Sequence, residues 1–247
     1  MKLMIIPTYV RRLFEKLIFV ELFSSICTRY LSQYYNHLQW GQWHKGSPEW
    51  FDHRIDLYRW ADHLNPHFVE RGIYSREVMF PGCKVLDLAS GDGFYPRFFY
   101  VSTGAFIDCI DVNSKAVYHS KKYHRHRNIH HFKLNAVRDD FPQSNYDVIC
   151  FDGAIDHFTR EQLDILLKKI KRALGSKGIL TAYQEIGKHA IDDEHPICFG
   201  TKEELVETFS PYFGLIGLLT TNTPGRINAY IRCSDDEKKM GRFCEQS

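Results

Sequence analysis

Two aspartates flank a glycine turn in the stretch VLDLASGDGFYPRFF, residues 85–99. Asp87 stands inside the apolar run, and Asp92 stands between Gly91 and Gly93. A small turn after a buried strand lets a ligand approach the backbone closely. The carboxylates attract a ligand that carries positive charge and repel a diphosphate. The spacing therefore indicates a binding site for a cationic ligand.

Two classes of nucleotide-like cofactor bind at such a turn. Dinucleotides place a pyrophosphate at the start of the following helix, and their fingerprint requires a third glycine where this chain has Pro96. S-adenosylmethionine instead brings an ammonium and a sulfonium to this place. The missing glycine and the two carboxylates favour S-adenosylmethionine, and an NAD-dependent oxidoreductase is the more distant alternative.

Polar residues also end the next two apolar runs. The run AFIDCIDVN carries Asp111, and an acidic side chain at this place can accept both hydroxyls of a ribose. The following run ends at Asn135 and Ala136, where an amide could bond the edge of an adenine. Taken alone, Asp111 is also compatible with a cap or turn. Together with the glycine turn, these residues predict a site for an adenosine-bearing cofactor.

The elements that must position these residues are short strands that alternate with helices. The expected strands are 84–90, 106–112, 130–136, 146–152 and 178–186, which is typical of a parallel sheet. Apolar spacing predicts a helix over 163–174 that stops at Gly175, where GSKG turns the chain. Thr201 and Glu204 predict a capped helix. Two further strands, 214–221 and 228–233, suit an antiparallel hairpin.

The N-terminal part differs from the rest of the chain in its predicted secondary structure. Residues 1–75 are predicted to be mostly helical and to form a leader and lid, followed by an α/β domain over 76–233 and a polar tail over 234–247. Residues 1–35 could form a basic amphipathic helix on a membrane surface, or pack on their own domain or on a partner. His53 and Arg54 are candidates for the lid.

Composition is that of an ordinary globular protein, with 44% hydrophobic and 25% charged residues. The net charge of +2 does not indicate a nucleic-acid partner. The chain has seven cysteines without a CxxC pair, which predicts reduced thiols, a cytoplasmic location and no metal site.

Five segments carry a family resemblance. VLDLASGDG, CIDVN, KLNA and YDVICFDGAIDHF, followed by LKKIKRALGSKGIL, resemble the successive motifs of class I S-adenosylmethionine-dependent methyltransferases across residues 80–186. The resemblance implies a Rossmann-like, doubly wound, mostly parallel seven-stranded sheet with a C-terminal antiparallel hairpin, here with a helical N-terminal cap. It implies S-adenosylmethionine as the cofactor. The predicted cofactor-binding residues are Asp87, Ala89, Gly91, Gly93, Asp111, Val112, Asn135, Ala136 and Asp152.

In this family Asp87, Ala89 and the two glycines would line the methionine end of the cofactor. Asp111 would hold the ribose, and Asn135, where the family often has Asp, would lie at the adenine. A looser likeness, carried by EWFDHRIDLY, AIDHFT and NAYIRC, is similar to bacterial methyltransferases of polysaccharide and natural-product pathways.

Methyl transfer to a hydroxyl requires alignment and the removal of one proton. His157 is the first candidate for the base, with Asp156 orienting a group, although His157 could instead cap or pack the next helix. Glu185 at the end of the fifth strand, and His189 and His195 after it, could face the same cleft or be solvated. The predicted catalytic set is His157, Asp156, Glu185 and His195.

The run 115–133 contains six basic residues, five histidines and no acid. It has no paired carboxylates or thiols for a metal. A solvated helix face is expected, and docking of nucleic acid is the alternative. The predicted function is methyl transfer to a small-molecule or glycan hydroxyl. The alternatives are an RNA or protein methyltransferase that docks through this run, and a non-catalytic cofactor-binding partner subunit. The acceptor and the oligomeric state stay open.

Overall fold

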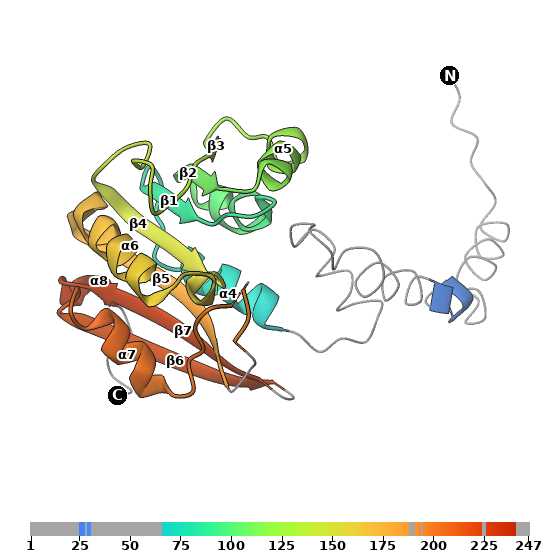
Figure 1. Cartoon of the computed structure of the whole chain (residues 1–247). Coiled ribbons are helices and arrows are strands. Elements are labelled where there is room, and N and C mark those ends of the chain that lie inside the picture. The colour runs from blue at the N-terminus through green and yellow to red at the C-terminus, as the bar shows by residue number, and fades with distance from the viewer. Residues whose placement is uncertain are drawn as a thin grey trace, which may run out of the picture. The chain divides into compact units, whose positions relative to one another are not determined.

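The computed structural model describes residues 25–27, 29–30, 66–187, 191–193, 195–223 and 226–240. The chain divides into two compact units, and every strand described here belongs to the unit that includes residues 64–247 (Figure 1). Most of the predicted amphipathic segment 1–35 and the lid candidates His53 and Arg54 lie outside the described residues. Within the described ranges, no helix has both the length and the apolar character needed to cross a bilayer.

A seven-stranded mixed sheet with the order β3-β2-β1-β4-β5-β7-β6 organises this unit. The strands are β1 (Lys84–Leu88), β2 (Phe106–Asp111), β3 (Ile129–Lys133), β4 (Tyr146–Asp152), β5 (Leu174–Ile186), β6 (Leu215–Thr223) and β7 (Arg226–Ser234). Strands β1 to β5 are parallel, whereas β7 runs antiparallel to both β5 and β6. The predicted fold class, including the closing hairpin, is confirmed.

Helices cover both faces of the sheet (Figure 1). They are α4 (His67–Arg76), α5 (Ser114–Tyr123), α6 (Arg160–Ala173), α7 (Lys202–Phe209) and α8 (Glu237–Met240), with a π-helix η3 (Pro96–Tyr100) and 3₁₀ turns η4 (Val101–Thr103) and η5 (Ile155–His157). The chain moves from β1 toward β3 in one direction and from β4 toward β5 in the other. Because such crossovers are right-handed, α5 and α6 lie on opposite faces.

Helix α6 shows why these residues form these elements. Its apolar residues Leu163, Leu166, Leu167 and Ile170 recur at helical spacing, and all are buried in the main core. Thr159 and Gln162 close a capping box at its start. The prediction that GSKG forms a turn between the helix and the next strand is wrong, because these residues belong to β5. The helix ends at Ala173 and β5 begins at once, with a shift in its register against β4 that accommodates the extra residues as a bulge.

The helix that follows the glycine turn begins where Pro96 predicts it, but it has π geometry. The N–H of Val101 donates to the carbonyl of Pro96, which is the wider spacing of a π-helix. A π turn inside a helix is rare and frequently lies at a functional site. Here it directly follows the turn that carries Asp92 and the glycines.

Two elements cross the domain boundaries that composition suggested. Helix α4 falls inside the predicted leader, yet its Tyr74 packs with Tyr183 of β5 and Tyr230 of β7. Helix α8 falls inside the predicted polar tail, yet Met240 is fully buried. Both segments are polar in sequence but each contributes an apolar side chain to the interior, so the domain extends beyond residues 76–233 on both sides.

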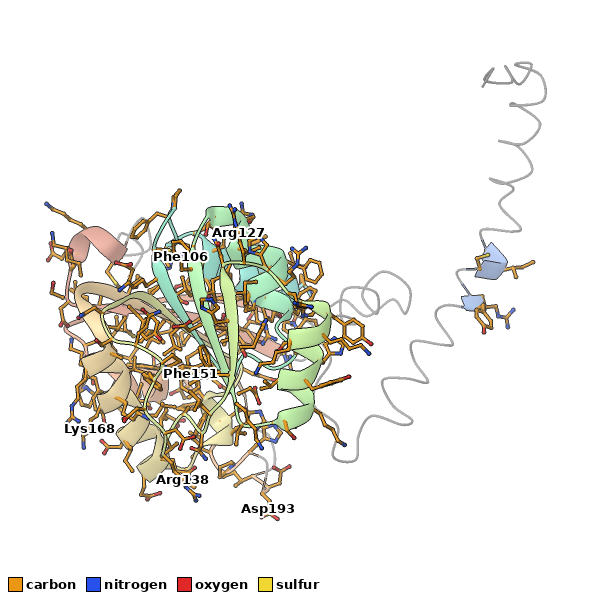
Figure 2. All side chains as sticks on the ribbon, turned by 90° about the horizontal axis from the view of Figure 1, so that it is seen from above. Phe106, Arg127, Arg138, Phe151, Lys168 and Asp193 are labelled. Atoms are coloured by element: carbon orange, nitrogen blue, oxygen red, sulfur yellow. The ribbon has the colours of Figure 1, made fainter. Side chains whose placement is uncertain are left out.

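The carboxyl ends of the parallel strands form one edge of the sheet. In Figure 2, Arg138, which follows β3, and Asp193, which follows β5, lie at this edge, while Phe106 and Arg127 lie at the opposite one. Phe151 lies fully buried between them. Ligands of open α/β sheets bind outside the carboxyl ends of the strands, so this edge is where the predicted site residues should meet.

Candidate cofactor and catalytic site

The turn after β1 is built from left-handed residues. Ala89 (φ 53°), Gly91 (φ 56°) and Gly93 (φ 81°) all have positive φ. A left-handed residue other than glycine costs roughly 1–3 kcal/mol and is found mainly at functional sites, which fits Ala89. The carboxylate of Asp92 is buried and accepts from the N–H of Phe94, two residues on, so it holds the turn itself. The turn thus presents backbone groups, and Asp92 does not present its charge to a ligand.

Asp111 connects the end of β2 to this turn. Its Oδ2 accepts from the N–H of Gly91 (2.9 Å) and its Oδ1 from the N–H of Asn113 (2.7 Å). Burial raises the pKa of Asp111, although these backbone bonds oppose the shift. Each oxygen keeps a lone pair for a further donor, as a ribose with two hydroxyls requires. The next residue, Val112, has an apolar side chain that is 62% exposed, which leaves a surface that a flat base could cover.

Two carboxylates lie near the ends of β1 and β4, of which Asp87 is buried and Asp152 is half-buried. Oδ2 of Asp152 accepts from Ser75 (2.9 Å) and Tyr100 (3.0 Å). Burial raises the pKa of Asp152 to about 6, although Arg71 and the two donated hydrogen bonds oppose the shift. Burial also raises the pKa of Asp87 well above its usual range, repulsion from Asp152 adds to the rise, and Arg71 counteracts it. Like charges held this close favour a bound cation.

Arg71 of α4 was not predicted from sequence. It is buried, its Nε donates to the hydroxyl of Tyr95, and its guanidinium lies 4.6 Å from the ring centre of Tyr95 and 5.3 Å from that of Tyr183. A side chain at Gly153 would collide with it, so Gly153 makes room for Arg71. The sequence contained one sign of this role. Arg71 and Ser75 are four residues apart and therefore share one face of a helix.

The described residues fit S-adenosylmethionine. The Oδ1 atom of Asp152 is buried and accepts no hydrogen bond from any described residue, so an ammonium group could fill this position. Asp111 has capacity for ribose hydroxyls, and Val112 offers an exposed apolar surface beside it. A diphosphate would instead meet the carboxylates of Asp87 and Asp152.

The predicted adenine residues lie after β3. Oδ1 of Asn135 accepts from the N–H groups of Val137 (3.0 Å) and Arg138 (3.2 Å), so this oxygen holds a turn. Its amide nitrogen makes no hydrogen bond to the described residues and is the atom left to contact a base. The carbonyl of Ala136 accepts from Lys169 of α6 (2.7 Å). The adenine role of Asn135 therefore depends on its amide nitrogen.

Two of the four predicted catalytic residues come together beyond β4, and a third, Asp156, precedes one of them in the chain. His157 ends η5, and its ring lies 4.6 Å from the ring of His195, which follows β5. Oδ2 of Asp156 accepts from Nε2 of Gln184 on β5 (3.0 Å). The proximity of His157 is one of the influences that lower the pKa of Asp111, so the pair of histidines lies near Asp111.

Glu185, the fourth residue, is held elsewhere. Its Oε2 lies 2.5 Å from Nη2 of Arg226 at the start of β7, and Nη1 of Arg226 lies 2.9 Å from Nε2 of His67 on α4. Glu185 and Gln184 are consecutive in a strand and therefore point to opposite faces. The structure thus separates Glu185 from the Asp156–His157–His195 group. His189 lies outside the described residues.

Comparison with known proteins agrees with this geometry. Residues 85–178 match the model of a methyltransferase domain. A TehB-like SAM-dependent methyltransferase from Corynebacterium glutamicum is 14% identical, with a TM-score of 0.55 over 75% of this chain and 95% of that chain. Phosphoethanolamine N-methyltransferase 2 from Haemonchus contortus, in complex with S-adenosyl-L-methionine, is 13% identical, with a TM-score of 0.54 over 64% of this chain and 50% of that chain.

The same fold has other uses. The [4+2]-cyclase SpnF is 18% identical, with a TM-score of 0.51 over 65% of this chain and 60% of that chain. The comparison with curated proteins finds no match. These structural likenesses establish the fold. The match over residues 85–178 shows a methyltransferase domain, and the acidic glycine turn fits S-adenosylmethionine as its cofactor.

Proposed function

We propose that this methyltransferase acts on a hydroxyl oxygen of a small-molecule or glycan acceptor, with His157 as the general base. The observation that supports this proposal is the pair of histidine rings, His157 and His195, that lie 4.6 Å apart beyond the carboxyl ends of β4 and β5, with Asp156 next to His157 in the chain. A hydroxyl is a poor nucleophile until its proton is removed, and histidine is suited to this task near neutral pH. An acceptor with a free amine or thiolate would need no such base.

The cofactor-binding residues have distinct roles in this proposal. Asp152 and Asp87 receive the ammonium group at the methionine end, with Arg71 limiting their mutual repulsion. Asp111 receives the ribose hydroxyls, and Val112 with Asn135 contacts the adenine. The glycines and Ala89 keep the backbone close to the ligand.

S-adenosylmethionine supplies the methyl group, and the remaining tasks belong to the chain. His157 takes the proton of the acceptor hydroxyl. Gln184 holds the Asp156 carboxylate, which orients the acceptor by accepting a hydrogen bond from a neighbouring hydroxyl. His195, beside the ring of His157, sets the position of that ring. The rate gain then comes from alignment and from one proton transfer.

The first test concerns the cofactor. S-adenosylhomocysteine should bind the purified full-length chain in a calorimetric titration, and NAD should not. The next test is a panel of hydroxylated sugars, phenols, amines and short RNAs with S-adenosylmethionine, followed by mass spectrometry of the products. Methylation of a hydroxyl compound is expected. Methylation of an amine or of RNA alone would overturn the proposed acceptor, and cofactor binding without any product would favour a non-catalytic partner subunit.

Two predictions about partners stay open to experiment. Contact of the N-terminal segment 1–35 with a membrane surface is tested by vesicle flotation of the full chain against a chain that lacks this segment. An RNA or protein acceptor docked through the run 115–133 would make methylation strongly dependent on salt, which a small neutral acceptor would not.

A further inference from the structure

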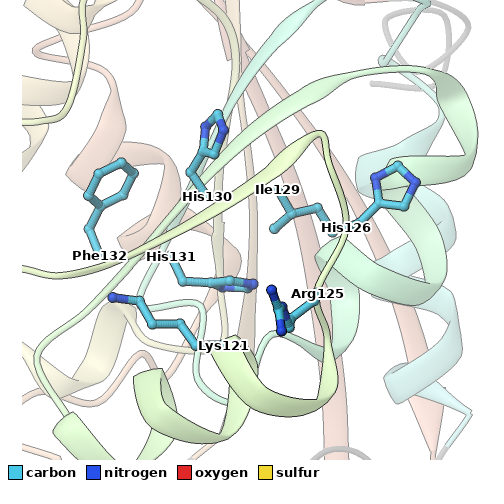
Figure 3. A pocket seen from close by; sticks show the side chains of 7 residues that line it. All are labelled: Lys121, Arg125, His126, Ile129, His130, His131 and Phe132. Carbon is cyan, nitrogen blue, oxygen red and sulfur yellow. The ribbon is translucent and has the colours of Figure 1, made fainter.

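A second polar site lies at the free edge of the sheet, beside β3 and the end of α5. It is a pocket of about 350 Å³ that Figure 3 shows from close by. Its lining residues are Lys121, Arg125, His126, Ile129, His130, His131 and Phe132. Five of these seven side chains carry or can acquire positive charge. None of them belongs to the predicted cofactor or catalytic residues, so this pocket needs its own explanation.

Positive charge is concentrated around this pocket. The run 115–133 contains six of the 32 lysines and arginines and none of the 30 acidic residues, so the rest of the chain has a net negative charge. Within the described part of the chain, neither Lys121 nor Arg125 has an ion-pair partner. Among the residues that the structure describes, the one carboxylate paired with a pocket side chain is Asp108, whose Oδ1 lies 3.3 Å from Nδ1 of His130. The positive charges of Lys121 and Arg125 in this pocket are therefore not neutralised by described carboxylates.

His131 gives the pocket an unsatisfied inner wall. Neither of its ring nitrogens makes a hydrogen bond of normal geometry to a described residue, although both atoms are buried. Desolvation lowers its pKa to about 4, the backbone of His124 opposes the shift, and the charges of His124, Lys121 and His130 add to it. The ring is consequently neutral in the empty pocket and can donate one hydrogen bond. An unsatisfied buried donor beside two exposed cations favours an anionic ligand.

We propose that this pocket binds a small phosphate-bearing ligand, with Lys121 and Arg125 contacting the phosphate and His131 donating from the inner wall. A phosphate presents three acceptor oxygens and up to two negative charges, which matches a lysine point charge, a guanidinium fork and one ring N–H. Ile129 and Phe132 line the same pocket and provide apolar contact for the organic part of the ligand. S-adenosylmethionine carries no phosphate, so this ligand is distinct from the cofactor.

A small ligand explains the pocket better than a nucleic acid does. A polymer follows an extended groove and stacks its bases on aromatic rings. The exposed rings of Tyr118 and Tyr123 are on α5, but they lie outside the pocket, and Lys122 lies 4.9 Å from the ring centre of Tyr123. The pocket is instead lined by seven residues from the end of α5, from β3 and from the segment between them. Nucleic acid is therefore the competing outcome of the test.

The probe is inorganic pyrophosphate, titrated calorimetrically into the full-length chain. Saturating S-adenosylhomocysteine is present, so that pyrophosphate cannot use the glycine turn. Saturable one-to-one binding is expected. Lys121→Gln and Arg125→Gln should each weaken it about tenfold, the usual effect of removing a charge-assisted hydrogen bond. Lys121→Arg, which keeps the charge, should weaken it less.

Lys115→Gln is the matched control, because it removes the same charge from the same helix outside the pocket. It should change the affinity less than about twofold, the scale of a screened surface charge. Equal weakening by Lys115→Gln would show general attraction by the helix and overturn the proposal. So would the absence of saturable pyrophosphate binding. A labelled single-stranded RNA that binds but is not displaced by excess pyrophosphate would also overturn it, in favour of a nucleic-acid surface.

Discussion

The two polar regions of this domain have opposite charge and opposite exposure. The cofactor site at the carboxyl edge gathers Asp87, Asp111 and Asp152, which are largely withdrawn from water, around one buried arginine. The β3-edge pocket gathers Lys121 and Arg125, which are exposed. Burial raises the pKa of Asp87 and Asp152, and a bound cation would favour their charged forms. The charged groups of Lys121 and Arg125 are in contact with water, so their charge costs little free energy.

The largest effect is expected at the catalytic end of the acidic site. His157→Gln should lower kcat by roughly 10²–10⁴-fold, the usual contribution of a general base, while leaving the affinity for S-adenosylhomocysteine within a few fold. Steady-state kinetics across pH measures this effect. The fall in kcat at low pH that reports protonation of the base in wild type should be absent from the variant. His119→Gln on α5 is the matched control. An unchanged kcat in the His157 variant would leave His157 as a packing residue.

Asp111→Ala should have the next largest effect. Loss of two hydrogen bonds to a carboxylate should weaken S-adenosylhomocysteine about 100-fold or more. The same substitution at the exposed Asp164 of α6, which pairs with Lys168, should have almost no effect on cofactor affinity. Calorimetry measures both variants. Pyrophosphate binding should be unchanged by Asp111→Ala, which separates the two regions, and a parallel loss of both ligands would instead mean a misfolded domain.

Asp152 should make stability depend on pH in an unusual direction. Its folded-state pKa of about 6 is above the value of an unfolded aspartate, so the folded form binds the proton more tightly. Its stabilising contribution is complete below about pH 4 and is lost as pH rises through 6.

Thermal unfolding of wild type and Asp152→Asn between pH 4 and pH 7.5 measures this contribution. The difference in stability between wild type and variant should shift in favour of the variant as pH rises. Affinity for the cationic cofactor should change the other way, increasing through pH 6 in wild type only. A pH-independent difference between the two proteins would mean that Asp152 is charged throughout.

The smallest effect is expected at Glu185. Its carboxylate is paired with Arg226 and is partly exposed, so Glu185→Gln should change the free energy of unfolding by less than about 1 kcal/mol. Its kcat should stay within about twofold of wild type if the ion pair is its only role. A loss of tenfold or more in kcat, with normal stability, would return Glu185 to the catalytic group.

Much of the fold was accessible from sequence because it rests on local pattern. The alternation of apolar runs and helices predicted every strand, and the Pro-Gly segment predicted the hairpin of β6 and β7. The glycine turn and the carboxylates predicted a cationic cofactor by charge alone. These inferences needed only the period of a helix or strand and the sign of a charge.

Other features depend on contacts between distant parts of the chain. Ser75 donates to Asp152 across 77 positions, and this long-range packing makes α4 part of the cofactor site and buries Arg71. The antiparallel register of β5 and β7 sets Glu185 opposite Asn228 and within reach of Arg226. No local pattern encodes which segment will cover a face.

The basic run shows both sides of this division. Sequence alone determined its charge, its lack of acids and its position between two predicted strands. Only the tertiary structure brought Lys121 at the end of α5 together with His131 in β3, so that a charged stretch became a pocket. Charge and periodicity are properties of the residues and their spacing, so the sequence alone determined them. The burial of side chains and their convergence at one place arise only when strands and helices pack, and this packing decided which polar side chains can act together.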